Sequence, residues 1–282
     1  MSGLEGFASS WFLFAESYLV GVFSAVLLAI LGVWVVGRRQ VFLGAAIAQA
    51  SGCGVAVALA LQLMLGFDSE GMQALVPVLA ATSGGLVGLL AAGRSRAARL
   101  DEGFVAWVFL VGASASVLFV AHHPEGLEII HRLLFSTILG STWSDVIILG
   151  GLMFLVAVLG LRFYEPIALL TLDPDASALA GMPVKRWSFV ISVGLGVSVG
   201  LVMQATGFLY TFGFLVLPVL AAREFCSEIR QILWVAPALA LSVVLPSFGF
   251  AYAIDLPPSQ VAVAALAALV VIGWTYRGTG RL

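Results

Sequence analysis

Nine long apolar segments, separated by short polar stretches, dominate the hydrophobic pattern of the chain. A helix rises about 1.5 Å per residue, so crossing about 30 Å of hydrocarbon takes about 20 apolar residues. The pattern therefore predicts an all-α, polytopic transmembrane helical bundle of about eight to nine spans, in a single domain over residues 1–282. The predicted spans are residues 18–36, 41–65, 73–93, 103–121, 144–163, 187–205, 207–222, 231–252 and 259–276. The seventh of these is the shortest, and a re-entrant segment is the alternative for it.

The positions of the basic residues predict the orientation of the spans. With nine alternating spans, only Arg132 among the 13 Lys and Arg residues falls on one side, and all the others fall on the opposite side. Cytoplasmic loops of membrane proteins are enriched in Lys and Arg, so the side with the cations is predicted to be the cytoplasm. The N-terminus is then outside and the C-terminus cytoplasmic. Residues 1–17, which include Trp11, Phe12 and Phe14, are predicted to form an interfacial segment.

Composition narrows the possible functions. The chain is 61% hydrophobic and 10% charged, whereas about a quarter of a soluble domain is charged. The net charge of −2 gives no indication of a nucleic-acid partner. The sequence contains no Gly-x-x-x-x-Gly-Lys-Ser/Thr motif, and it also lacks the His-Glu-x-x-His motif of metal-dependent hydrolases. We therefore expect a protein that is not an enzyme and that binds no cofactor itself.

The stretch between the fifth and sixth predicted spans, residues 164–187, is longer than an ordinary turn. In it, Asp173 is a typical N-cap residue, and Pro174 suits the first turn of a helix. Residues 176–180 favour a short helix, and Gly181 suits the position after its end. The pattern predicts a compact helix at the cytoplasmic face. It could be part of an ordinary linker or a docking helix for a cytoplasmic partner.

Five segments, in order along residues 38 to 276, resemble the zinc/manganese-type permease family of ABC importers. They are Arg38 to Val55, Leu133 to Leu139, Leu172 to Met182, Gly207 to Arg223, and Tyr252 to Pro257. None of these matches is specific alone, but the ordered set is.

The resemblance implies a permease subunit in the bacterial plasma (inner) membrane that translocates a divalent transition metal, Zn²⁺ or Mn²⁺. It also implies three kinds of partner: a cytoplasmic subunit that binds ATP, an external metal-binding protein, and a second permease subunit in a homodimer or heterodimer. A coupling segment, residues 171–186, would contact the ATPase. The residues matched to that contact are Asp173, Pro174, Asp175, Ala176, Ala178, Leu179 and Gly181.

The translocation path implied by the resemblance departs from the family pattern at three positions. The family typically has an aspartate and a histidine, four residues apart, in the second span; this chain has Ala45 and Gln49. Alanine offers no metal ligand, and an amide oxygen is a weak one for a transition metal. Thr137 replaces a residue that is often acidic or a small hydroxyl. Two readings of Gln49 stay open: an interhelical hydrogen bond, or a polar group lining the path.

These departures leave alternatives for the function: a permease of the same fold for another solute, or a membrane scaffold that transports nothing.

All three histidines of the chain lie in one predicted outer loop, residues 121–132. Imidazole and carboxylate groups suit Zn²⁺ and Mn²⁺, so this loop could capture metal at the entrance. The candidate ligands are His122, His123, Glu125, Glu128 and His131. A polar loop that faces water or docks the binding protein is the alternative.

Overall fold

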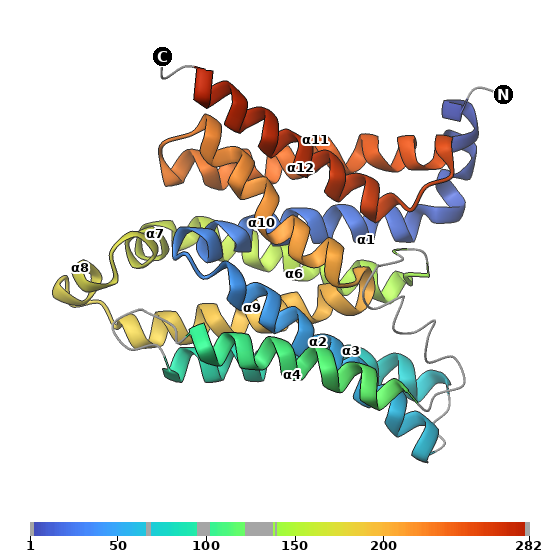
Figure 1. The fold of residues 1–282 in the computed structure, drawn as a ribbon, viewed down its shortest axis with the longest axis horizontal. Coiled ribbons are helices and arrows are strands. Elements are labelled where there is room, and N and C mark those ends of the chain that lie inside the picture. Colours follow the sequence, from blue (N-terminus) through green and yellow to red (C-terminus); the bar gives the residue numbers. More distant parts are fainter. Residues whose placement is uncertain (1–2, 66–68, 95–101, 122–137, 139, 280–282) are drawn as a thin grey trace.

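Nine helices long and apolar enough to cross a membrane lie in the part of the chain that the structure describes. The computed structural model describes residues 3–65, 69–94, 102–121, 138 and 140–279. The long helices run roughly along the long axis of the molecule (Figure 1). They are α1 (Gly3–Gly37), α2 (Val41–Leu65), α3 (Ser69–Arg94), α4 (Glu102–Val120), α6 (Trp143–Arg162), α9 (Val184–Thr206), α10 (Phe208–Phe225), α11 (Ile229–Ile254) and α12 (Pro258–Thr279). The prediction of an all-α membrane bundle is confirmed.

The predicted spans agree with these helices to within a few residues, with one extension. α1 begins at Gly3 and is continuous with its apolar span, which starts at Phe14, so the expected interfacial segment belongs to the first helix. The doubtful seventh span is α10, an unbroken helix of 18 residues despite the internal Pro218. That length corresponds to about 27 Å, close to the hydrocarbon thickness.

The bundle has two groups of helices that meet along α2, α9 and α10 (Figure 1). One group contains α2, α3, α4 and α9, and the other contains α1, α6, α10, α11 and α12. Within the second group, Tyr210 of α10 is fully buried, and its hydroxyl donates a 2.7 Å hydrogen bond to the Gly21 carbonyl oxygen of α1. A buried Tyr hydroxyl needs such a partner, so this bond fixes α10 against α1.

Glycines allow α3 and α9 to approach each other closely. A Cβ on Gly84 or Gly88 of α3 would collide with the carbonyl oxygens of Gly196 and Ser192 on α9. Gly196 has the reciprocal constraint, because its Cβ would meet the Gly84 carbonyl. Small residues at a helix crossing allow backbone contact in lipid, where association depends on close packing.

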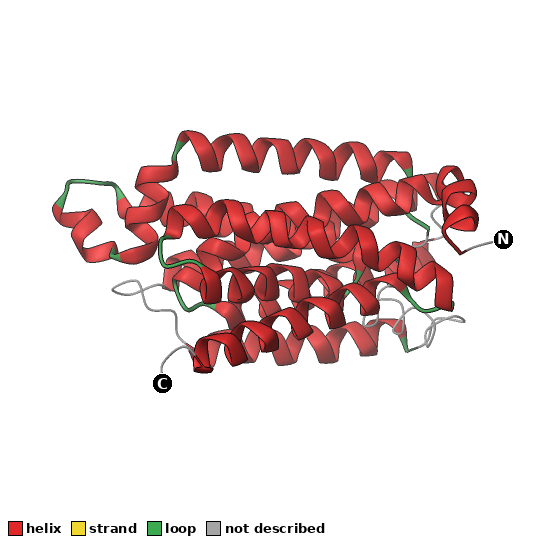
Figure 2. Cartoon of the chain, turned by 90° about the horizontal axis from the view of Figure 1, so that it is seen from above, coloured by secondary structure: helices red, strands yellow, loops and turns green. Residues whose placement is uncertain are grey.

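The two ends of the bundle differ in charge. The end that carries the short helices α7 (Tyr164–Leu172) and α8 (Pro174–Leu179) is also where α12 finishes, whereas α1 begins at the opposite end (Figure 2). Basic residues of the described chain lie at or beside helix ends on the α8 side: Arg38, Arg39, Arg94, Arg162, Lys185, Arg186, Arg223, Arg230 and Arg277. This asymmetry fits the positive-inside rule, and the assignment of that side to the cytoplasm stays a prediction.

Candidate functional site

The short helix α8 has the caps that the sequence predicts. One carboxylate oxygen of Asp173 accepts hydrogen bonds from the backbone N–H groups of Asp175 at 3.1 Å and Ala176 at 2.9 Å. The helix then starts at Pro174, which has no N–H to leave unsatisfied. At the other end Gly181 has φ of +79°, a conformation that costs glycine little. These caps stabilise a helix of six residues that would be too short to persist alone.

α8 projects beyond the ends of the long helices, as Figures 1 and 2 both show. Its side facing the protein carries Ser177, which is fully buried and donates a 2.9 Å hydrogen bond to the Asp173 carbonyl oxygen at the start of the same helix. Its other side carries Leu179, which is 90% exposed. At this protruding tip, outside the membrane spans, Leu179 is accessible to a partner protein.

A second helix of this region, α7, was not predicted. The sequence analysis places residues 164–172 in the connecting stretch and predicts no helix there. In the structure Pro166 lies in the first turn of α7, where a missing N–H breaks no hydrogen bond. α7 also brings Leu172, 69% exposed, to the junction with α8. The Glu165-Pro166 pair at a helix start was the signal that could have identified this element.

The predicted path residues Ala45 and Gln49 lie one turn apart on α2 and therefore share a face. Both are buried, at 4% and 5% exposure. α4 crosses α2 at this level, because a Cβ on Gly112 would lie 2.9 Å from the Gln49 carbonyl carbon. Gln49 makes no side-chain hydrogen bond to the part of the chain that the structure describes. The interhelical hydrogen bond, one of its two readings, is therefore not found within this chain's described residues.

The remaining site residues of the sequence analysis fall outside the described residues. These are Thr137 and the loop residues His122, His123, Glu125, Glu128 and His131. Within the described ranges, no group of three or more His, Cys, Asp or Glu side chains is placed to hold a metal ion. The histidine loop thus stays a prediction.

A family model matches nearly the whole chain. The match to "ABC 3 transport family" runs from residue 12 to residue 277. The chain belongs to this family. As a member of the ABC 3 family it is also similar to individual bacterial proteins. It is 23% identical over 243 residues to the "Probable metal transport system membrane protein" of Chlamydia pneumoniae, an alignment that covers 86% of this chain and 81% of that protein. It is 25% identical to the "Zinc transport system membrane protein TroC" of Treponema pallidum, over 77% of this chain and 74% of TroC.

The fold of this ABC 3 family member has a counterpart among solved structures. The structure described as "PsaBC from Streptococcus pneumoniae in complex with Fab" superposes with a TM-score of 0.79 at 16% identity. The superposition covers 96% of this chain and 95% of that one. The two chains therefore share the same arrangement of helices. At 16% identity this similarity shows a common fold and does not extend to function.

Proposed function

We propose that this chain is the membrane-spanning permease subunit of an ATP-binding-cassette importer, and that its cargo is a divalent transition metal, Zn²⁺ or Mn²⁺. A separate subunit would hydrolyse ATP, since this chain lacks the phosphate-loop motif. Membership in the ABC 3 family and similarity to proteins named for metal and zinc transport support the proposal.

The observation that carries the proposal is α8. It is a capped helix at the basic end of the bundle, outside the membrane spans, with an apolar tip exposed. A channel or carrier working alone has no need of such a surface. The ATPase would bind α8 through Leu179 and the exposed face around Asp175 and Ala178, and movement of the ATPase would reach the bundle through α7 and α9.

The second candidate, a permease of the same fold for another solute, is favoured by α2. The family's usual aspartate and histidine are replaced by Ala45 and Gln49, so strong transition-metal ligands are missing from that face. If the cargo is a metal ion, we infer that this face of α2 binds the ion only weakly. Transport requires a site weak enough to release the ion, and an amide meets that requirement.

We also propose the further partners that the resemblance implies: an external metal-binding protein and a second permease subunit. The loop that contains His122, His123 and His131 would then catch metal near the entrance. Replacing these three histidines by alanine should lower uptake at limiting metal while leaving uptake at saturating metal unchanged. Identical uptake at both concentrations would remove the loop from the mechanism.

The proposed function is tested by purifying the chain with its ATPase and binding protein and measuring ATP hydrolysis with a series of ions. We expect binding protein loaded with Zn²⁺ or Mn²⁺ to stimulate hydrolysis several-fold, while Mg²⁺-ATP alone and Ca²⁺ leave the basal rate unchanged. Stimulation by a non-metal solute only would support the second candidate. If no ATPase copurifies and nothing stimulates hydrolysis, the chain is a scaffold and the proposal is wrong.

A further inference from the structure

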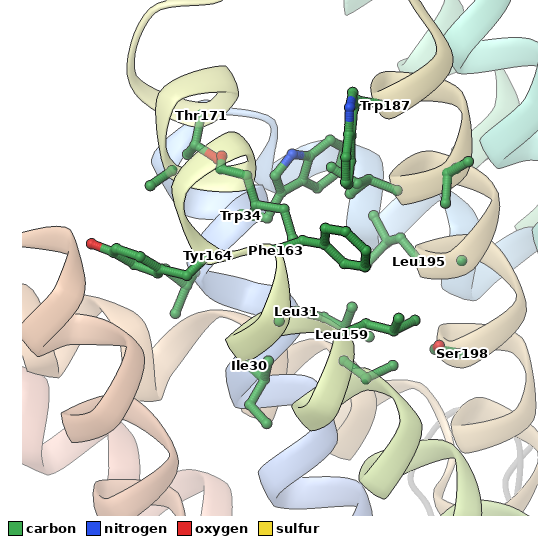
Figure 3. A pocket seen from close by; sticks show the side chains of 18 of the residues that line it. Ile30, Leu31, Trp34, Leu159, Phe163, Tyr164, Thr171, Trp187, Leu195 and Ser198 are labelled. Carbon is green, nitrogen blue, oxygen red and sulfur yellow. The ribbon is translucent and has the colours of Figure 1, made fainter. Parts of the chain in front are cut away.

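An apolar pocket of about 610 Å³ lies between α6 and α9, and residues of α1, α7 and α11 form its other walls (Figure 3). α6 and α9 meet beyond it at one end, where Gln204 donates a 3.2 Å hydrogen bond to Asp145. They meet at the other end through the rings of Phe163 and Trp187, whose centroids are 5.3 Å apart. Between these contacts the two helices are separated, and we call this space the α6–α9 pocket.

The α6–α9 pocket is about as deep as one leaflet of a bilayer. Its lining on α6 extends from Phe163 back to Leu152, and its lining on α9 extends from Trp187 to Ser198. Each stretch rises about 16 Å, and one leaflet of hydrocarbon is about 15 Å thick. The pocket thus reaches from the membrane surface on the α8 side to about the bilayer middle. Its walls are mainly Leu, Ile and Val side chains, which suits an acyl chain and does not suit a hydrated ion.

The mouth of the α6–α9 pocket is basic and aromatic. Arg186 lines the pocket, and the Arg162 guanidinium stacks 5.5 Å from the centre of the Phe163 ring. Neither arginine forms an ion pair with any residue that the structure describes. Lys185 is adjacent to Arg186 in the sequence, and the exposed acidic residues Glu165 and Glu228 are each adjacent to a residue that lines the pocket. The rim therefore has a net positive charge facing the lipid headgroup region.

One buried donor at the same mouth has no partner. Trp34 lines the pocket and is only 5% exposed, and its indole Nε1 has no hydrogen-bond acceptor among the described residues. Arg38 stacks 5.3 Å from the centre of the Trp34 ring and donates a 3.3 Å hydrogen bond to Ser188. An unsatisfied buried N–H is costly, and an ester carbonyl oxygen of a lipid would satisfy it. Tryptophan typically occupies this interfacial level.

We infer that the α6–α9 pocket binds one anionic phospholipid from the leaflet on the α8 side, with an acyl chain in the pocket and the phosphate at Arg186 and Arg162. The depth of the pocket, the charge of its rim and the free indole N–H each match one part of that molecule. The bound lipid would contact Ile167 and Thr171 of α7 and so hold α7 in place. Any effect on ATP hydrolysis rests on the proposed function, whereas lipid binding does not.

The headgroup part of the inference is tested by native mass spectrometry of the purified full-length chain, titrated with phosphatidylglycerol or phosphatidylcholine of identical acyl chains. A cation near a membrane surface contributes about fivefold to the affinity for anionic lipid. We therefore expect phosphatidylglycerol to bind more tightly, and Arg186→Gln to weaken it about fivefold. Arg162→Gln should weaken it further. Arg223→Gln removes a cation at the same end from α10, a helix that contributes no residue to the pocket, and it should change nothing.

The acyl-chain part is tested by filling the α6–α9 pocket. Gly194 lines the pocket, and a Cβ there would have no atom within 4 Å, so Gly194→Phe starts from open space and adds a ring to the pocket. This variant should lose the bound phosphatidylglycerol. Gly151→Phe is the matched control on α6, since Gly151 is equally open but does not line the pocket, and it should retain the lipid.

Equal binding of the two lipids, or unchanged phosphatidylglycerol binding in Arg186→Gln and Gly194→Phe, would overturn the inference. If these variants instead shift the protein between dimer and monomer without affecting lipid binding, a second copy of the chain occupies the pocket and the lipid assignment is wrong.

Discussion

For Gln49, the sequence predicts its position on α2, and the structure adds its burial and its lack of a side-chain hydrogen bond within the described residues. The sequence predicts a polar side chain on the same helical face as Ala45, and α2 confirms that spacing. The sequence left open whether the amide bonds to a neighbouring helix. In the structure Gln49 is buried but makes no side-chain hydrogen bond within the described part of the chain. Burial and partners depend on how α4 crosses α2, which helical periodicity cannot give.

Restoring the two metal ligands typical of the family should increase the amount of metal that the protein binds. Ala45→Asp together with Gln49→His places a carboxylate and an imidazole one turn apart, a pairing that binds Zn²⁺ and Mn²⁺. We expect the purified complex to retain at least tenfold more metal than the wild type, measured by elemental analysis after desalting, and to transport it more slowly. Gln49→Leu, which removes the amide, should retain no extra metal. A folded double variant with wild-type metal content would show that this face of α2 does not meet the cargo.

At the scale of single elements, the coupling segment and α7 show which features can be predicted from neighbouring residues in the sequence. The N-cap at Asp173 and the turn at Gly181 were predicted correctly, because both depend on residues within a few positions of each other. α7 was not predicted, although Pro166 lies in its first turn, where proline is compatible with a helix. The projection of α8 away from the bundle depends on tertiary packing, and the sequence does not indicate it.

The exposed tip of α8 gives the second prediction. Leu179→Asp should abolish copurification with the ATPase, since it places a charge in an apolar contact, and should leave the chain folded because Leu179 is 90% exposed. The measurement is the molar ratio of ATPase to permease after affinity purification. Leu256→Asp, at an exposed position beyond α11 at the opposite end, is the control and should keep the normal ratio. Equal ratios for both variants would exclude Leu179 from the interface.

The α3–α9 crossing gives the third prediction, which compares two glycines of α9. Gly196→Ala forces a methyl group against the Gly84 carbonyl, and overpacking of this kind costs about 1–3 kcal/mol. Gly194→Ala meets no atom within 4 Å and gains helix propensity, so its stability should be equal or slightly higher. Thermal unfolding in detergent should show a lowered midpoint for Gly196→Ala only. Similar midpoints for the two variants would show that the helices do not touch at Gly196.

For the whole molecule, the number and bounds of the spans follow from the sequence because each span is a local stretch of about 20 apolar residues. Once the spans are known, the side on which each cation lies follows from counting spans along the sequence, so the asymmetric placement of the cations was also predictable. The pairing of helices into two groups was not, since nearly uniform apolar surfaces carry little information about neighbours. The α6–α9 pocket likewise arises from residues on helices far apart in the chain, such as Trp34 and Arg186.

The central claim is that this bundle moves a metal ion when its partner hydrolyses ATP. The most direct measurement is ion accumulation in vesicles that contain the reconstituted permease, its ATPase and the external binding protein. The account predicts ATP-dependent accumulation of Zn²⁺ or Mn²⁺ that is lost in Leu179→Asp and retained in Leu256→Asp. An assembled complex that hydrolyses ATP but accumulates neither ion would contradict it.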